Sequence, residues 1–508
     1  MDNMNPHWGD WKLPLPPIPA EQIREQSDCD VLILGAGIAG VSCALRCAQN
    51  GLRVTVMEKT DKWSARGGNI GGANSAYMRS MGYENDVDTL TREWIKRCGN
   101  RCDETLVRLY LRESETALDW LTELLTRPEY GARPALQDCL YRGETYYEYF
   151  GSLRFFDGPM AKKGLRPGAA DAVYAMYEES RKLGVTYRFR CTAAELVKDG
   201  ERVCGAVGQT DAGFVRVNAA KGVVIATGDI GGSDEMCADL APLANRCAVK
   251  IYSPRGGNTG DGHRLGLWAG GLFEETPFPT MLHPQAFCFA NYCFLFVDHE
   301  GKRFMNEDTS VQAKGLAILR RGMTYAWSII DDAFTEKVPL TLPYGGGIFW
   351  DVDHSPGEPG FTPEGARAML QRGLNAGTVV QADSIEALAE KMGVPAENLR
   401  ESVARINAAS ARGKDPEFGK RPELLLPLEK PPFYALKFGP ALLAVVGGLQ
   451  VTERMELKRA GGGRVPGLYA IGNAAGGRYG VDYPTMILGN SHGSALTFGY
   501  LLGNYLAE

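Results

Sequence analysis

A short glycine-rich segment directly after an apolar run most constrains the fold of this chain. Residues 31–34 read Val-Leu-Ile-Leu, and residues 35–40 read Gly-Ala-Gly-Ile-Ala-Gly. A second apolar run, residues 52–57, ends directly before Glu58. A strand, a tight Gly-x-Gly-x-x-Gly turn, a helix, a second strand and an acidic residue form the fingerprint of a dinucleotide-binding βαβ unit.

Each part of this fingerprint has its own expected role. Gly35 permits the tight turn, Gly37 lets the backbone approach a pyrophosphate, and Gly40 allows close packing of helix on strand. The unpaired N–H groups at the helix start favour phosphate binding, and the acidic residue binds a ribose hydroxyl. The motif alone does not distinguish NAD from FAD. The contacts expected from this unit are Gly35, Ala36, Gly37, Ala39, Gly40, Glu58 and Lys59.

Size and composition limit the function classes. A chain of 508 residues exceeds one ordinary core, so two or three domains are expected. The net charge of −6 gives no electrostatic reason to expect nucleic acid. No apolar run of transmembrane length and no secretory signal are recognisable, which predicts a cytoplasmic protein without a membrane partner. The twelve cysteines include no CxxC pair, so we expect buried thiols and no metal site.

The order of segments predicts an interrupted α/β chain. Residues 1–27, rich in proline and tryptophan, indicate an extended arm that docks on its own body or on a second subunit. Apolar spacing predicts helices over 103–127, 168–184 and 490–506. Residues 223–226 predict a buried parallel strand that ends at Thr227-Gly228. Between residues 278 and 445 aromatic residues are more frequent and patterns typical of buried parallel strands are fewer. This change indicates an inserted second domain.

Further segments point to one family. Residues 67–69 (Gly-Gly-Asn), 258–262 (Asn-Thr-Gly-Asp-Gly), 301–307 (Gly-Lys-Arg-Phe-Met-Asn-Glu) and 467–473 (Gly-Leu-Tyr-Ala-Ile-Gly-Asn) follow the fingerprint in order. In this arrangement the chain resembles the flavoproteins related to fumarate reductase and succinate dehydrogenase, from about residue 28 to 506. The resemblance implies that FAD, rather than NAD, is the dinucleotide.

The resemblance also implies an architecture. It predicts an α/β fold with a Rossmann-like FAD-binding domain, residues 28–277 and 446–508, and an inserted α+β capping domain, residues 278–445, after the arm 1–27. FAD is expected to be non-covalent, because residues 67–74 hold no histidine that would carry the bond. Further expected cofactor contacts are Gly67, Gly68, Asn69, Gly71, Gly72, Thr227, Gly228, Gly472, Asn473, Gly489, Asn490 and Ser491.

The substrate half departs from the family pattern. Fumarate reductases hold two carboxylates with histidine and arginine side chains. Val311 and Met486 stand where arginines are expected, and Ala444 begins the segment that otherwise starts with histidine. An unpaired carboxylate in a dry site costs several kcal/mol. We therefore expect a neutral, ring-bearing substrate, either steroid-like or polyphenol- and isoflavonoid-like, whose activated C=C bond is reduced by hydride from flavin N5.

Tyrosines are the expected proton donors, because a phenol can protonate a developing enolate. The catalytic candidates are Tyr483, His283, Tyr479, Tyr292 and Asp482, the last as a base beside the tyrosine. Two alternatives stay open: a dehydrogenase of the 3-ketosteroid type, which the Tyr-Pro segment also resembles, and a flavoprotein that only transfers electrons. With one nucleotide fingerprint and no haem motif, electrons are expected from an external carrier or a separate flavin reductase.

Overall fold

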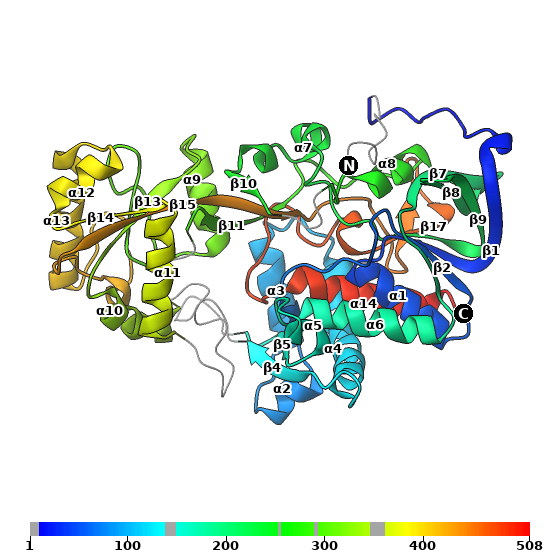
Figure 1. Cartoon of the computed structure of the whole chain (residues 1–508), viewed down its shortest axis with the longest axis horizontal. Coiled ribbons are helices and arrows are strands. Elements are labelled where there is room, and N and C mark those ends of the chain that lie inside the picture. The colour runs from blue at the N-terminus through cyan, green and yellow to red at the C-terminus, as the bar shows by residue number, and fades with distance from the viewer. Residues whose placement is uncertain (1–9, 138–148, 252–255, 289–292, 346–360) are drawn as a thin grey trace.

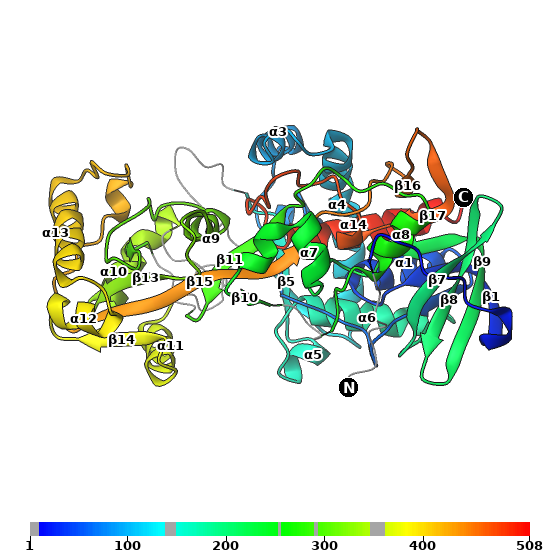
Figure 2. The same cartoon turned by 90° about the horizontal axis from the view of Figure 1, so that it is seen from above.

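The computed structural model describes residues 10–137, 149–251, 256–288, 293–345 and 361–508. Figures 1 and 2 show two lobes joined by extended strands, of which the longest is β15 (Phe433–Val445). The larger lobe carries the fingerprint and the C-terminal helix. The smaller lobe, called the cap below, is built around the other end of β15.

The large lobe contains an eight-stranded sheet with the order β16-β17-β9-β1-β2-β6, to which β7 and β8 are attached through β9. The pairs β1–β2, β1–β9 and β9–β17 are parallel, so their carboxyl ends meet at one edge. The strands are β1 (Ile23–Leu34), β2 (Val54–Met57), β6 (Thr186–Arg188), β7 (Thr192–Asp199), β8 (Arg202–Thr210), β9 (Gly213–Ile225), β16 (Glu456–Lys458) and β17 (Arg464–Ala470).

Helices of the large lobe pack on this sheet and on one another through their apolar sides. Figure 1 shows α1 and α14 side by side with α6 and α4 near them, and α1 contacts both α14 and α6. The Asp103 carboxylate caps α4 by accepting from the Thr105 and Leu106 N–H groups. The helices of this lobe are α1 (Ile38–Gln49), α2 (Ala76–Ser80), α3 (Val87–Arg97), α4 (Glu104–Thr126), α5 (Pro159–Lys162), α6 (Ala169–Lys182), α7 (Asp234–Leu240), α8 (Asp261–Trp268) and α14 (Asn490–Tyr505).

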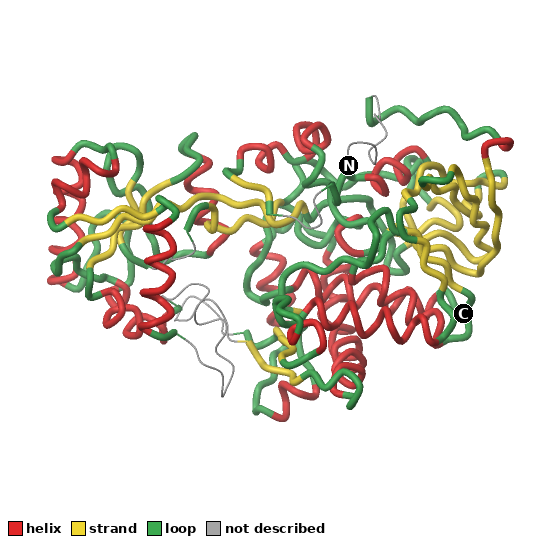
Figure 3. The backbone as a smooth tube through the Cα atoms, in the orientation of Figure 1, coloured by secondary structure: helices red, strands yellow, loops and turns green. Residues whose placement is uncertain are grey.

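Two further sheets complete the fold (Figure 3). A small antiparallel sheet, β3 (Ile70–Gly71), β5 (Ser152–Phe156) and β4 (Arg133–Gln137), lies beside the large lobe's helices. The cap sheet has the order β10-β15-β13-β12, with β11 and β14 also on β15. Its remaining elements are β10 (Val249–Lys250), β11 (Thr280–Ala286), β12 (Leu295–Val297), β13 (Ala326–Asp331), β14 (Val379–Ala382), α9 (Val311–Arg320), α10 (Phe334–Thr341), α11 (Pro363–Asn375), α12 (Ile385–Met392) and α13 (Ala396–Arg412).

The predicted fold class is confirmed: a mixed sheet with a parallel centre and covering helices carries an inserted α+β lobe. The helices predicted over 103–127, 168–184 and 490–506 are α4, α6 and α14 within two residues. Residues 23–27, assigned to the arm from sequence, instead belong to β1, because β1 pairs with β9 from Ile23 onward. Residues 24–27 are all polar, so this end of the strand lacks the alternation of apolar and polar residues by which a strand is recognised in a sequence.

The described part of the arm docks on its own chain. Trp11 is almost fully buried, and its indole N–H donates to the Asp239 carboxylate (3.0 Å). The Trp268 indole in turn donates to the Trp11 carbonyl (3.1 Å). Contact with a second subunit stays a prediction. Among the described residues, none of the helices combines the length and apolar character that crossing a bilayer requires.

Candidate active site

A cavity of about 520 Å³ lies where the carboxyl ends of the central strands meet the strands that lead to the cap. This is the edge at which open α/β sheets bind ligands. Eleven of the cofactor contacts predicted from sequence line it: Gly35, Gly37, Ala39, Glu58, Lys59, Gly67, Thr227, Gly228, Gly472, Asn473 and Ser491.

The glycine turn is shaped by close backbone approach. Gly35 has a φ of 108°, and a Cβ there would lie 2.5 Å from the Ala226 carbonyl oxygen. A Cβ on Gly40 would lie 1.9 Å from the Gly35 oxygen, so α1 can begin here only with glycine at both positions. Gly37 is the N-cap of α1 and supplies no side-chain cap. The helix start therefore presents N–H groups to the cavity, as a phosphate site requires.

Glu58 is fixed at the end of β2. One carboxylate oxygen accepts the Ala36 N–H (2.8 Å), and the other accepts the N–H and hydroxyl of Thr60 (2.9 and 2.8 Å). The neighbouring Lys59 ammonium pairs with Asp261 (2.9 Å), which joins this corner to the 258–262 segment. The Glu58 carboxylate is thus held beside the glycine turn, at the position where the dinucleotide-binding motif binds a ribose hydroxyl.

The other predicted cofactor residues lie behind the cavity wall. The Gly71 N–H donates to the Gly489 carbonyl (3.0 Å), and a Cβ on Gly493 would lie 1.5 Å from the Gly71 oxygen. The Asn490 amide donates to the Pro484 carbonyl (2.8 Å). These positions let segments pack closely. Direct cofactor contacts by Ala36, Gly40, Gly68, Asn69, Gly71, Gly72, Gly489 and Asn490 stay predictions.

The start of α14 completes the cavity. The Ser491 hydroxyl donates to the Asn473 side-chain oxygen (2.9 Å). The His492 Nδ1 donates to the Asn69 carbonyl (2.9 Å), since a carbonyl oxygen only accepts. Burial lowers the pKa of His492, so the ring is neutral. A phosphate site at α1, a carboxylate after β2 and a helix start at the far wall together fit an extended FAD molecule.

Tyr479 and Tyr483 lie next to each other below this wall, with ring centroids 5.3 Å apart. The Tyr479 hydroxyl is fully buried and donates to Asn490 (3.0 Å), so its position is that of a core residue. The Tyr483 hydroxyl accepts the Ser491 N–H (3.2 Å), and Ser491 lines the cavity. Burial raises the pKa of Tyr483 well above its ordinary value, which keeps the phenol protonated.

The remaining catalytic candidates lie around the same region. The Asp482 carboxylate accepts the Tyr483 N–H (2.9 Å), and burial raises the pKa of Asp482 to about 6. His283 lies on β11 opposite Ala441, and burial, together with the Arg166 charge, lowers its pKa to about 4. Tyr292 lies outside the described residues. The four described candidates surround the cavity without lining it.

The cap side of the cavity is mainly apolar, with Gln285 from β11 as a polar side chain in its lining. Met281 from β11 and Leu443 and Ala444 from β15 line it. Val311, the first residue of α9, is fully buried, and Met486 is nearly so. Sequence reasoning did not identify two cations that also line the cavity, Arg66 and Arg166. Arg66 directly precedes the predicted cofactor segment Gly67-Gly68, and this position in the sequence could have assigned it to the cavity.

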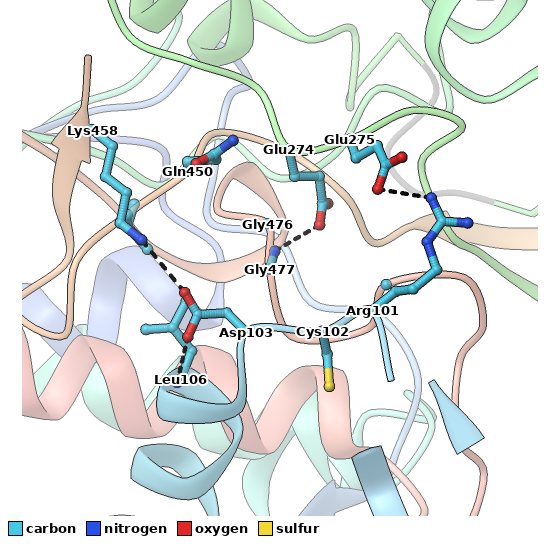
Figure 4. Close-up of a pocket in the computed structure, with 12 residues that line it drawn as sticks. Arg101, Cys102, Asp103, Leu106, Glu274, Glu275, Gln450, Lys458, Gly476 and Gly477 are labelled. Atoms are coloured by element: carbon cyan, nitrogen blue, oxygen red, sulfur yellow. Dashed lines mark hydrogen bonds and ion pairs between the residues drawn. The ribbon is translucent and has the colours of Figure 1, made fainter. Parts of the chain in front are cut away.

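A second, smaller pocket of about 190 Å³ lies beside the C-terminal segment (Figure 4). Its centre is the Glu274 carboxylate, which accepts the N–H groups of Gly448 (2.9 Å) and Gly477 (2.8 Å). Burial raises the pKa of Glu274 to about 7. Sequence reasoning gave this pocket no role. Two ion pairs, Lys458–Asp103 (3.4 Å) and Arg101–Glu275 (2.8 Å), surround it.

Comparison with known proteins identifies the family. The model of the family described as FAD binding domain matches residues 30–485. The chain belongs to this family. It is 26% identical to a vinyl phenol reductase of Lactiplantibacillus plantarum, over 96% of this chain and 98% of that protein. It is 25% identical to a fumarate reductase (cytochrome) of Shewanella frigidimarina, over 94% of this chain and 77% of that protein.

Solved structures share the fold. A flavocytochrome c3 fumarate reductase in an open conformation matches 96% of this chain and 79% of its own, with a TM-score of 0.70 at 21% identity. A 3-ketosteroid-Δ4-(5α)-dehydrogenase of Rhodococcus jostii matches 97% of this chain and 100% of its own, with a TM-score of 0.73 at 23% identity. The predicted resemblance and the FAD cofactor are confirmed: this member of the FAD binding domain family is an FAD-dependent oxidoreductase.

Proposed function

We propose that this oxidoreductase reduces an activated C=C bond of a neutral, ring-bearing substrate. The observation that carries the proposal is the mainly apolar cap side of the cavity, in which Gln285 is a neutral polar side chain. Ala444 faces the cavity where the family pattern has a histidine, and Met281 and Leu443 lie beside it. Apolar walls favour a substrate that brings apolar surface. They disfavour a dicarboxylate, because Lys59 and Arg66 already pair with Asp261 and Asp229, which leaves Arg166 as one cation for two carboxylates.

The comparisons support the same substrate class. Two of the proteins reported above are named for ring-bearing compounds, a vinyl phenol and 3-ketosteroids. The vinyl phenol reductase matches this chain along nearly its full length. The electron donor in this proposal is an external carrier or a separate flavin reductase, because one nucleotide fingerprint is present.

The chain's own residues supply the proton and the orientation. FAD, when bound, supplies a hydride equivalent to the substrate carbon. Tyr483 holds the second proton at its hydroxyl oxygen, because that oxygen accepts from Ser491 and leaves its own hydrogen available. Asp482 holds the Tyr483 main-chain N–H and has a pKa of about 6, and in this proposal it is the neighbouring acid that returns a proton to the tyrosine from solvent. The start of α14, which lines the cavity through Ser491 and His492, would present N–H groups to a bound flavin.

A second candidate function is the reverse reaction. Two relatives from Sinomonas cyclohexanicum act as dehydrogenases by name, and the one called 4-oxocyclohexanecarboxylate 2-dehydrogenase is 25% identical over 95% of this chain and 93% of its own. The same cavity and the same tyrosine would then serve desaturation of a cyclic ketone.

Anaerobic flavin titration distinguishes these functions. The holoenzyme is reduced with dithionite and mixed separately with 4-vinylphenol, 4-androstene-3,17-dione and fumarate, while flavin absorbance is followed. We expect a ring-bearing alkene to reoxidise the flavin and fumarate to leave it reduced. Reoxidation by fumarate at about ten per second, a typical turnover rate, would contradict the proposal. Flavin bleaching of the oxidised enzyme by saturated cyclic ketones, without alkene reduction, would select the reverse reaction.

A further inference from the structure

Three cationic side chains line the cavity, and they differ in their partners. The Lys59 ammonium pairs with the buried Asp261 carboxylate at 2.9 Å. The Arg66 guanidinium pairs with the buried Asp229 carboxylate at 2.8 Å. Arg166 is exposed to the cavity and forms no ion pair or hydrogen bond within the described ranges. Arg166 is therefore a positive charge that none of the described residues neutralises.

Close packing of the neighbouring glycines fixes the course of the main chain at Arg166. A Cβ on Gly168 would lie 1.9 Å from the Gly68 carbonyl oxygen, so the turn before α6 packs directly on the Gly67-Gly68 segment. A Cβ on Gly67 would in turn lie 2.8 Å from the His492 ring. Arg166 thus stands at the cavity wall formed by the glycine-rich segment and α14.

The charge of Arg166 acts on groups from both lobes. It contributes to the lowered pKa of His283, on the cap strand β11, and to that of His492, on α14. It also contributes to the lowered pKa of Arg154, to about 10, after burial. A cation that influences both the cap strand and the cofactor wall lies in the space between them, which is where the proposed function places the substrate.

Two cations lie at this end of the cavity: Arg66, which pairs with Asp229 and donates to the Leu443 carbonyl (3.0 Å), and Arg166. The surrounding histidines, His283 and His492, are neutral. The cap-side lining is also uncharged and consists of Met281, Gln285, Leu443 and Ala444. A guanidinium in such surroundings favours an oxygen that carries negative charge, because charge-assisted hydrogen bonds gain strength where water is excluded. A neutral alkene without an oxygen would leave it without a partner.

We propose that Arg166 binds the oxygen of a phenol whose ring is conjugated with the C=C bond to be reduced. This inference rests on the proposed function and names its substrate class. The phenol is neutral in solution, and it loses its proton to the solvent as it binds beside Arg166 as a phenolate. Its electron pair moves into the ring as a proton from Tyr483 adds to the outer alkene carbon, which forms a neutral quinone methide. Hydride from the reduced cofactor then adds to the carbon next to the ring, and the electron pair returns to the oxygen beside Arg166.

Binding of unreactive ligands tests this inference without turnover. 4-Nitrophenol at mildly alkaline pH is an anionic probe, and 4-nitroanisole is its neutral methyl ether. Both are titrated into the oxidised holoenzyme by calorimetry. We expect Arg166→Met to weaken 4-nitrophenolate binding by roughly 10- to 100-fold, the range for a hydrogen bond to a charged group, and to change 4-nitroanisole binding less than twofold. Arg166→Lys should restore part of the phenolate affinity.

Lys163→Met is the matched control, because Lys163 is an exposed cation of the same loop that does not line the cavity. It should leave both affinities unchanged. Equal weakening of both ligands by Arg166→Met, or no weakening of either, would overturn the inference. Loss of FAD affinity or a shifted flavin midpoint potential in Arg166→Met, with phenolate binding intact, would instead assign the cation to the cofactor and likewise overturn it. Absence of alkene reduction in the wild-type enzyme, with charge-selective phenolate binding retained, would refute only the proposed function.

Discussion

Replacing Glu274 with glutamine should change how the protein's stability depends on pH. The Glu274 carboxylate holds two N–H groups, from Gly448 and Gly477, and burial raises its pKa from about 4.5 to about 7. Between these values the folded chain binds more protons at this site than the unfolded chain. The free energy of unfolding therefore falls as pH rises from about 4.5 to about 7, and the loss is complete above that range.

The size of this loss follows from the pKa. A difference of this size corresponds to about 3 kcal/mol for a fully buried group. Because Glu274 is only half-buried, solvent screens part of this energy. We therefore expect the free energy of unfolding to fall by about 1.5–2 kcal/mol across this pH range. For a chain of 508 residues the unfolding entropy is about 1 kcal/mol per kelvin. The wild-type Tm should therefore fall by about 2 °C across this pH range, relative to a variant that cannot titrate here.

Calorimetric melting at several pH values from 5 to 8 measures this effect. Glu274→Gln should lower Tm at every pH, because an amide N–H₂ cannot accept both backbone N–H groups, but its curve should lack the extra fall. Glu275→Gln is the control, since Glu275 is largely exposed and pairs with Arg101 at the surface. Parallel Tm curves for wild type and Glu274→Gln would show that the carboxyl does not titrate in this range and would refute the reasoning.

Three further predictions concern the cofactor and the proton donor. Glu58→Ala should weaken FAD binding to the apoprotein by roughly 10- to 100-fold, measured by fluorescence titration, since hydrogen bonds to charged groups contribute about 1.5–3 kcal/mol; unchanged affinity would contradict the ribose contact. FAD should be released by acid precipitation, and yellow colour retained in the pellet would exclude non-covalent binding. Tyr483→Phe should lower alkene-dependent flavin reoxidation by roughly 100-fold with FAD content unchanged, as for loss of a general acid, whereas Tyr479→Phe should have a small effect because Asn490 uses that hydroxyl. Full activity of Tyr483→Phe would return Tyr483 to a packing role.

The parts of the fold that the sequence predicts are those fixed by local sterics. The turn from Gly35 to Gly40 needs glycine because of contacts within a few residues and with Ala226, directly after β9, so the pattern is visible in one short segment. The helices α4, α6 and α14 follow from apolar spacing. Glu58 is recognisable because it stands at a fixed place after β2.

The parts that the sequence does not reveal depend on approaches between distant segments. Arg166 faces the cavity because Gly168 packs on Gly68, a contact across 100 residues that no local pattern indicates. Glu274 binds Gly448 and Gly477, and a Cβ on Gly447 or Gly476 would lie 2.5 Å from its carboxylate oxygen. The motif around Gly447-Gly448 was visible, but its carboxylate partner was not, since glutamates of this type are common at surfaces.

The strand β15 runs from the cap to the cavity wall without a break, so the two are rigidly connected along its length. Its 13 residues extend about 40 Å. At one end Phe433–Phe438 pair with β13 inside the cap, and at the other end Ala441–Val445 pair with β11, where Ala444 forms the cavity wall. Main-chain hydrogen bonds resist sliding along such a strand, whereas twisting and bending are soft. Cap motion should therefore be a torsion of this strand, so that a substitution in the distant cap core changes the angle at which Leu443 and Ala444 meet the substrate.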